Sequence, residues 1–179
     1  MRWRVLKSEV VYRSRIFDVR RDQSRALSDG REHEFLVLEM PDWVNVVPIT
    51  SDGDVVLVRQ FRHGIRELTL EVPAGIVDPC DASPDVAARR ELREETGYDA
   101  PTLEPLGVVH PNPAISNNRC FMFATRNAVL AGPPQWDGTE EIAVETVPLQ
   151  RIPELIRDGV ISNALTLVAF QLLHLKTGG

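Results

Sequence analysis

Three glutamates in one short segment, Glu91, Glu94 and Glu95, are the side chains of this sequence best suited to chemistry. Their i, i+3 and i+4 spacing places all three on one face of a helix. Like charges repel on such a face unless cations offset them, and Arg90, four residues before Glu94, is placed to neutralise one. Hard divalent cations prefer carboxylate oxygens, so the pattern predicts a Mg²⁺ site, with Mn²⁺ as a second candidate ion.

The helix that must carry these glutamates has clear ends in the sequence. Ser83 followed by Pro84 predicts its start, because a serine oxygen caps free N–H groups and proline suits the first helical position. Gly97 predicts a left-handed stop. The alternative interpretation is a solvated surface helix, since charge runs interleaved with arginines usually mark exposed faces.

The residues from Gly75 to Tyr98 resemble the Nudix box, in which Gly, five residues, Glu and seven residues precede Arg-Glu-aliphatic-any-Glu-Glu-any-Gly-aliphatic. Gly75 and the run from Arg90 to Gly97 match this pattern in register, and a match of such length is specific. Asp81 replaces the box glutamate, eight residues separate it from Arg90, and Tyr98 takes the last aliphatic position. The first two departures fall before the helix, so they concern the salt bridge of that loop and leave the metal-facing carboxylates unchanged.

Apolar runs along the chain predict the elements around this helix. Strands are expected at residues 34–39, 43–49, 55–60, 68–72, 103–109, 119–124 and 141–147, with a hairpin turn at 51–54. Two helices are expected at the end, one over 149–157 and one capped by Ser162 or Asn163 that runs to about Lys176. The resemblance implies the Nudix α/β/α sandwich around a mixed β-sheet, with a β-rich N-terminal region at 1–40 and the catalytic domain at 41–179.

The composition excludes several classes of partner. A formal net charge of −6 argues against broad binding to nucleic-acid phosphates. Apolar runs are short and interrupted, so no transmembrane helix or other membrane contact is expected. Cys80 and Cys120 lie in separate segments and are expected to be free thiols in a reducing cytoplasm.

The resemblance also implies a reaction. Nudix enzymes hydrolyse a nucleoside diphosphate linked to another group, and bound Mg²⁺ activates a water against the pyrophosphate bridge. It implies further that the carbonyl of Ala74 is a metal ligand beside the three helix glutamates, with Glu95 and Arg90 counted among the catalytic residues. In the ADP-ribose pyrophosphatase subgroup a loop glutamate serves as base or as an extra metal ligand, and register favours Glu140, with Glu141 second.

Three further segments resemble that subgroup, which also includes nucleotide-sugar hydrolases: residues 58–62, residues 70–75, and the turn at 158–164. They make Arg59 a candidate to grip a phosphate and Glu71 a candidate to accept from a ribose hydroxyl, with Arg62 as a further candidate. A strand-end ion pair is the alternative for Arg59. The loop Pro111-Asn112-Pro113-Ala114 departs from the subgroup's Pro-any-Pro-Gly turn, which leaves the sugar open.

Two other classes remain alternatives to a pyrophosphohydrolase of this subgroup. One is a non-catalytic sensor that binds ADP-ribose or another nucleotide, which the intact glutamates disfavour. The other is an isoprenoid diphosphate isomerase, for which the Cys and His metal ligands are not evident. The resemblance further suggests a homodimer in which the N-terminal strands pack on the partner.

Overall fold

The chain forms two compact units in the computed structural model, which describes residues 2–136 and 141–178. The first unit comprises the residues up to Asp42 together with His110–Arg119, and the second comprises Trp43–Val109 and the residues from Cys120 onward. The division along the chain therefore falls after Asp42. The first unit also includes the loop that precedes the strand beginning at Cys120.

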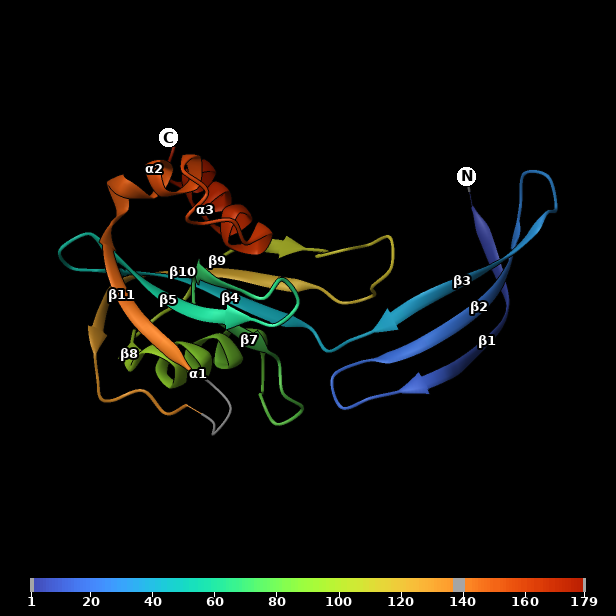
Figure 1. Cartoon of the computed structure of the whole chain (residues 1–179), viewed down its shortest axis with the longest axis horizontal. Coiled ribbons are helices and arrows are strands. Elements are labelled where there is room, and N and C mark those ends of the chain that lie inside the picture. Colours follow the sequence, from blue (N-terminus) through green and yellow to red (C-terminus); the bar gives the residue numbers. More distant parts are fainter. Residues whose placement is uncertain (1, 137–140, 179) are drawn as a thin grey trace. The chain divides into compact units, whose positions relative to one another are not determined.

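The first unit is an antiparallel sheet of three strands in the order β1-β2-β3 (Figure 1). Leu38 at the end of this sheet ties in the 110–119 loop, because its N–H donates to the Ile115 carbonyl at 2.7 Å and its carbonyl accepts from Asn117 N–H at 3.2 Å. The strands are β1 Trp3–Arg13, β2 Asp18–Ala26 and β3 Glu32–Glu39.

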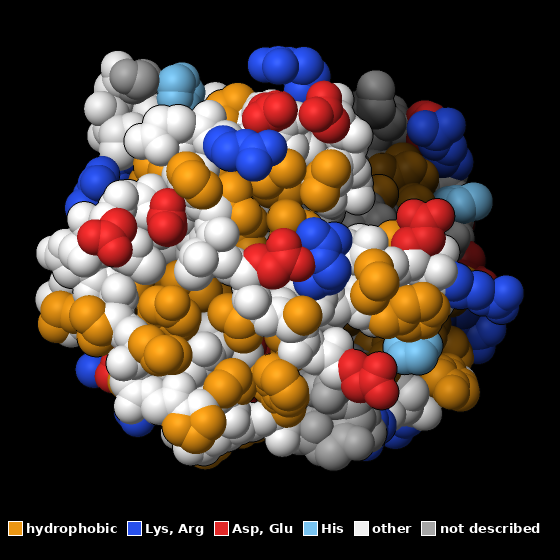
Figure 2. All heavy atoms as spheres, turned by 60° about the vertical axis from the view of Figure 1, so that its left-hand side comes forward, with side chains coloured by type: hydrophobic (Ala, Val, Ile, Leu, Met, Phe, Trp, Pro, Cys, Tyr) orange, Lys and Arg blue, Asp and Glu red, His pale blue; other side chains and the backbone are white. Residues whose placement is uncertain are grey.

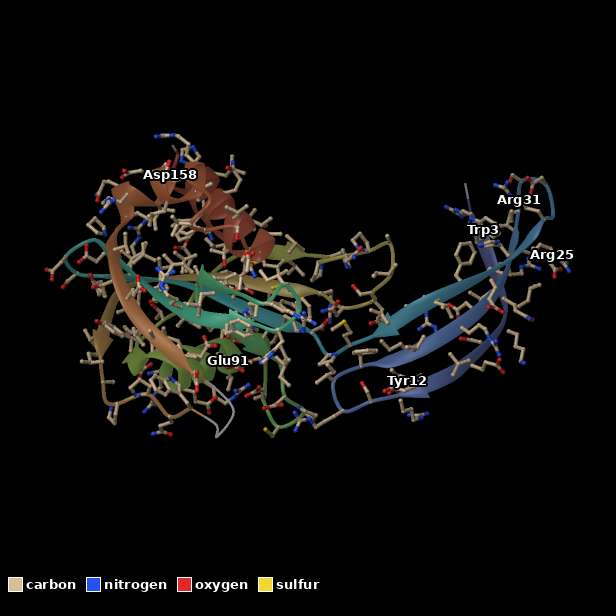
Figure 3. All side chains as sticks on the ribbon, viewed as in Figure 1. Trp3, Tyr12, Arg25, Arg31, Glu91 and Asp158 are labelled. Carbon is tan, nitrogen blue, oxygen red and sulfur yellow. The ribbon has the colours of Figure 1, made fainter. Side chains whose placement is uncertain are left out.

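Apolar and aromatic side chains are exposed on this first sheet. Trp3 packs edge-on against Phe35 with ring centroids 5.1 Å apart, and the guanidinium of Arg31 lies 5.7 Å from the Trp3 ring (Figure 3). Trp3 keeps 39% of its surface exposed and Phe35 keeps 37%. Exposed apolar surface of this kind on an open sheet is typical of protein–protein contacts.

The second unit contains a mixed sheet of eight strands. Its central strand β4 runs parallel to β10 and antiparallel to β5, and the order β11-β5-β4-β10-β8 is joined by β6 on β5, β7 on β4 and β9 on β10. The strands are β4 Trp43–Thr50, β5 Asp54–Arg62, β6 Glu67–Glu71, β7 Ala74–Ile76, β8 Tyr98–Asp99, β9 Glu104–Val109, β10 Cys120–Leu130 and β11 Ile142–Pro148.

Helices cover both faces of this sheet (Figure 1). They are α1 Pro84–Thr96, a short 3₁₀ turn η1 at Leu149–Arg151, α2 Ile152–Arg157 and α3 Ala164–Thr177. Within the described residues no helix is long and apolar enough to cross a membrane.

Alternate residues of β4 divide the core into two layers. Val44 and Val46 pack with Leu92 of α1, whereas Val47 packs with Phe170 of α3. Successive side chains of a strand point to opposite faces, so one buried strand supports helices on both sides. The expected α/β/α sandwich around a mixed sheet is confirmed.

The helix ends follow the sequence signals with one correction. Gly97 ends α1 at φ 74° and donates its N–H to the Arg93 carbonyl at 2.9 Å, as its type predicts. Asn163 rather than Ser162 caps α3. The capping role expected of the Ser83 oxygen is wrong, because the structure gives that side chain no cap hydrogen bond and α1 begins on the Ser83 carbonyl, which accepts from Ala87 N–H at 3.1 Å.

A hollow of about 690 Å³ lies against α2 and α3, lined mainly by apolar side chains such as Ile152, Phe170 and Leu173. Figure 2 shows hydrophobic side chains distributed between charged ones over one face of the molecule. Among the described residues that line it, His174 is the only one with an Asp, Glu, His or Cys side chain, so the hollow lacks a cluster of such groups.

Candidate functional site

Two of the three helix glutamates meet the backbone turn at Ala74 and Gly75. The Oε2 atom of Glu95 accepts from the N–H of Ala74 at 3.0 Å. The carboxylate of Glu91 lies so close to Gly75 that a Cβ added there would fall 2.1 Å from its Cδ and Oε1 atoms. Figure 3 labels Glu91 on α1. Only glycine leaves room for this approach, which explains the first residue of the box pattern.

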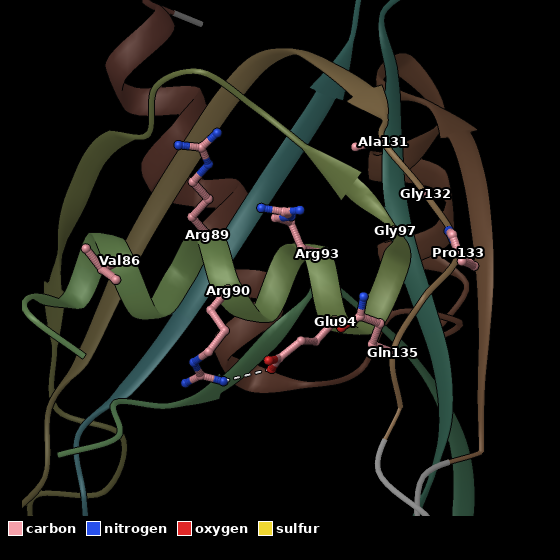
Figure 4. A pocket seen from close by; sticks show the side chains of 10 residues that line it. All are labelled: Val86, Arg89, Arg90, Arg93, Glu94, Gly97, Ala131, Gly132, Pro133 and Gln135. Carbon is pink, nitrogen blue, oxygen red and sulfur yellow. Dashed lines mark hydrogen bonds and ion pairs between the residues drawn. The ribbon is translucent and has the colours of Figure 1, made fainter. Parts of the chain in front are cut away.

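Arg90 donates hydrogen bonds to three carboxylates of the box, those of Asp81, Glu91 and Glu94. Its Nη1 donates to Glu91 Oε1 at 2.8 Å and to Glu94 Oε2 at 2.9 Å, the second contact being dashed in Figure 4. Its Nε and Nη2 donate to the two oxygens of Asp81 at 3.2 and 3.0 Å. These hydrogen bonds raise the pKa of Arg90, and the one to Asp81 has the largest effect. The guanidinium therefore stays charged and holds the helix to the preceding loop.

The loop salt bridge survives both departures from the box pattern. Asp81 closes a tight turn in which its Oδ2 accepts from Asp78 N–H at 2.9 Å and its own N–H donates to the Asp78 carbonyl at 2.9 Å. The Arg90 hydrogen bonds lower the pKa of Asp81. A shorter acidic side chain on a loop one residue longer thus reaches the same arginine.

The donor set of this region suits a divalent cation. The side chains of Glu91 and Glu94 and the buried Glu95 supply carboxylate oxygens, and the Ala74–Gly75 backbone lies against two of them. Oxygen-only ligands of this kind are what Mg²⁺ prefers. In residues 2–136 and 141–178 no three Asp, Glu, His or Cys side chains are gathered as a ready metal-binding group, and Arg90 occupies oxygens of Glu91 and Glu94.

The two arginines proposed for substrate contact lie on opposite faces of β5. Arg59 is paired with Glu145 of β11 at 2.6 and 3.2 Å, the ion pair that was the alternative for this residue. Arg62 is three residues further along, so its side chain points to the other face. On that face the hydrogen bond to Glu71 has the largest effect in raising the pKa of Arg62, and the negative charge of Glu95 raises it further. The structure thus brings Arg62 toward the α1 carboxylates, and Arg59 lies apart from them.

Glu71 is held by protein groups on both of its oxygens. It is 2% exposed and accepts from Arg62 at 2.8 and 2.7 Å, from Thr69 Oγ1 at 2.6 Å and from Asn163 Nδ2 at 3.0 Å. Burial alone would raise the pKa of Glu71, but these hydrogen bonds outweigh it and leave the pKa below its ordinary value. Thr69 and Asn163 were not among the predicted site residues. The same-face i, i+2 spacing of Thr69 and Glu71 was the available signal for the first.

The two candidate bases follow a segment fastened to the end of α1. Gln135 N–H donates to the Glu94 carbonyl at 2.8 Å, and the indole N–H of Trp136 donates to the Glu95 carbonyl at 2.9 Å. Glu141 is exposed just before β11, and Glu140 lies outside the described residues.

The hollow beside the Ala74 turn is small and is lined by both polar and apolar side chains. It measures about 310 Å³, and its lining includes Arg62, Glu71, Ala74, Gly75 and Asn163. A larger hollow of about 740 Å³ runs along the outer side of α1, where Arg89 and Arg93 point away from the Arg90–Glu94 pair (Figure 4). Arg90 and Glu94 also line this larger hollow. The smaller one is lined by Ala74 and Gly75, the backbone that Glu95 and Glu91 contact.

Known proteins resemble this chain over most of its length. Residues 40–166 match the NUDIX domain family. The ADP-ribose pyrophosphatase of Bacillus subtilis (strain 168) is 27% identical over 97% of this chain and 93% of its own length, and that of Mycobacterium tuberculosis (strain ATCC 25618 / H37Rv) is 28% identical over 97% and 84%. A crystal structure described as an ADP compounds hydrolase superposes with a TM-score of 0.87 at 26% identity, covering 100% of this chain and 97% of the other.

Proposed function

Because the chain belongs to the NUDIX family and is a Nudix pyrophosphohydrolase, we propose that its substrate is ADP-ribose, with a nucleotide sugar as the alternative. Water adds across the pyrophosphate bridge, so the P–O–P linkage breaks into a nucleoside monophosphate and a sugar phosphate. For ADP-ribose the products are AMP and ribose 5-phosphate.

One observation carries the proposal: the carboxylates of Glu91 and Glu95 converge on the Ala74–Gly75 backbone. A solvated surface helix would turn such charges toward water, yet Glu95 is only 5% exposed. Burying carboxylates is costly unless they are paired or bind a cation. Their position beside a hollow that Arg62 also lines suits a cation-assisted attack on a diphosphate.

Glu91, Glu94, Glu95 and the Ala74 carbonyl are the groups we propose to hold Mg²⁺, or Mn²⁺ in its place. When bound, such ions neutralise the diphosphate and lower the pKa of a bound water. Arg90 competes for the oxygens of Glu91 and Glu94 and also anchors α1 to Asp81. It therefore keeps these carboxylates together in a helix that would otherwise suffer from their repulsion.

Arg62 is the arginine we propose to contact the anionic substrate. It lines the hollow beside Ala74. Its hydrogen bonds to Glu71 use Nε and Nη2, and within the described residues Nη1 has no hydrogen-bond partner. Glu71 and Arg59 stay predicted substrate contacts, although both currently pair with protein groups. Glu140, with Glu141 second, stays the predicted base that takes the proton of the attacking water.

We further propose a homodimer in the cytoplasm. The exposed Trp3 and Phe35 of the first sheet supply an apolar surface of the kind that a second copy would cover. Both cysteines are free, Cys80 exposed and Cys120 buried, which suits a reducing compartment.

The test is product analysis after incubation of the purified protein with Mg²⁺ and a panel of ADP-ribose, NADH, GDP-mannose, UDP-glucose and diadenosine polyphosphates. We expect AMP from ADP-ribose, and loss of turnover when a chelator removes the metal. Turnover of only a GDP- or UDP-sugar would keep the chemistry and change the substrate. Tight binding of ADP-ribose without cleavage of any compound would refute hydrolysis and favour a sensor.

A further inference from the structure

The N-terminus of α3 reaches back to the strand that leads into the site. Asn163 uses both ends of its amide: Oδ1 accepts from Leu165 N–H at 2.9 Å and Thr166 N–H at 3.0 Å, and Nδ2 donates to Glu71 Oε2 at 3.0 Å. One side chain therefore caps the helix and supplies a hydrogen bond to a buried carboxylate.

A second contact from the same helix turn fixes the next residue of the strand. Val72 N–H donates to the Oγ1 atom of Thr166, a fully buried residue, at 3.3 Å. Two residues further on, Ala74 N–H donates to Glu95 of α1. The segment 71–74 is thus held at one end by α3 and at the other by α1.

Glu71 transmits this hold to Arg62, because its two oxygens accept from Nε and Nη2 of the guanidinium. Arg62 is 41% exposed while the Glu71 side chain is 2% exposed, so the carboxylate is the fixed partner of the pair. Paired donors fix an arginine in orientation as well as in position.

We propose that Asn163 is a positioning residue for substrate binding: it holds Glu71, and through it Arg62, in the hollow beside Ala74. This inference rests on the proposed function for its kinetic consequence, and its structural part stands without it. Asn163 touches no reacting atom in this account. Its effect on the reaction passes through the Arg62 guanidinium.

Two substitutions separate the cap from the hydrogen bond to Glu71. Asn163→Ser keeps a good N-cap but is too short to reach Glu71, whereas Asn163→Ala removes both. We expect both variants to raise KM about tenfold with little change in kcat, as loss of a group that orients a binding residue does. We expect a fall in melting temperature chiefly for Asn163→Ala. Unchanged KM in Asn163→Ser, or kinetic losses that follow only the melting temperature, would overturn the proposal.

Two further measurements secure the assignment. In an Arg62→Lys background, adding Asn163→Ser should change KM little, because the two residues act in series; fully additive losses would contradict this. By NMR, the Arg62 Nε–H should exchange with solvent faster in Asn163→Ser than in the wild-type protein. That readout needs no substrate, so a faster exchange in a protein that cleaves nothing would refute the proposed function and keep the positioning role. Unchanged exchange would refute the positioning role itself.

Discussion

Replacing Gly75 by alanine should lower activity about 100-fold while leaving the fold nearly intact. The added Cβ would lie 2.1 Å from the carboxylate carbon of Glu91, against an ordinary carbon–carbon contact of about 3.5 to 4.0 Å. The atoms that must yield are the far end of a flexible side chain, so we expect a cost near the low end of overpacking, about 1 kcal/mol. For a chain of this size that corresponds to a fall of about 2 to 4 °C in melting temperature.

The catalytic cost should be much larger than the cost to stability. Glu91 must leave its place beside the Ala74–Gly75 backbone by more than an ångström, and a misplacement of this size costs about 100-fold in rate. That factor corresponds to about 2.7 kcal/mol in the activation barrier. Gly75 is not at a positive φ, so strain in the backbone adds nothing to the expected loss.

The assay is kcat/KM for AMP release from ADP-ribose, read beside the melting temperature. Gly64→Ala is the matched control, because a Cβ there meets nothing within 4 Å and its φ is not positive. We expect Gly64→Ala to behave as the wild-type protein. Full activity in Gly75→Ala would refute the role of Glu91 at this turn, and a large fall in melting temperature would refute the claim that the carboxylate yields easily.

Two other outcomes follow from the ion pairs. Asp81→Asn should lower the free energy of unfolding by about 1 to 3 kcal/mol, because a nearly buried charged partner of Arg90 is lost; an unchanged urea midpoint would contradict this. Glu9 should titrate with a pKa of about 2 in a ¹³C NMR experiment, owing to hydrogen bonds from Lys7 first and then Arg21. Since its folded pKa is lowered, its contribution to stability is present above the ordinary value of 4.5 and is lost as the pH falls toward 2. A Glu9 pKa near 4.5 would show that these contacts do not persist in solution.

The box helix could be predicted from local signals in the sequence, whereas the sandwich around it followed from the family resemblance. Gly97 ends α1 in a left-handed conformation that glycine adopts without strain, whatever the helix packs against. Asn163 caps α3 by accepting hydrogen bonds from the N–H groups of two residues that follow it in the chain. Such features depend on neighbours in the chain, which the sequence displays directly.

The sequence could not show which side chains meet across the fold. Glu145 and Arg59 are far apart in the chain, and only the register of β11 on β5 brings them together. Glu71 and Asn163 likewise meet because the last helix begins beside β6. The resemblance implied which residues contact the metal and the substrate. It gave no signal for the protein groups, such as Glu145 and Asn163, that hydrogen-bond to those residues.

The Ser83 correction has the same cause. A serine before a proline favours a helix start, and α1 does start there, yet the direction of its hydroxyl depends on the loop geometry that precedes it. Propensity fixed the position of the helix end, and tertiary structure decided the hydrogen bond.

The most direct test of the central claim is the rate of AMP release from ADP-ribose at saturating Mg²⁺ for Glu95→Gln beside the wild-type protein. The amide oxygen of glutamine can still accept from Ala74 N–H, so the turn is kept while the negative charge is lost. Glu104→Gln, an exposed change elsewhere, is the control. We expect a loss of at least about 100-fold in Glu95→Gln and none in Glu104→Gln. Equal rates in all three proteins would contradict it.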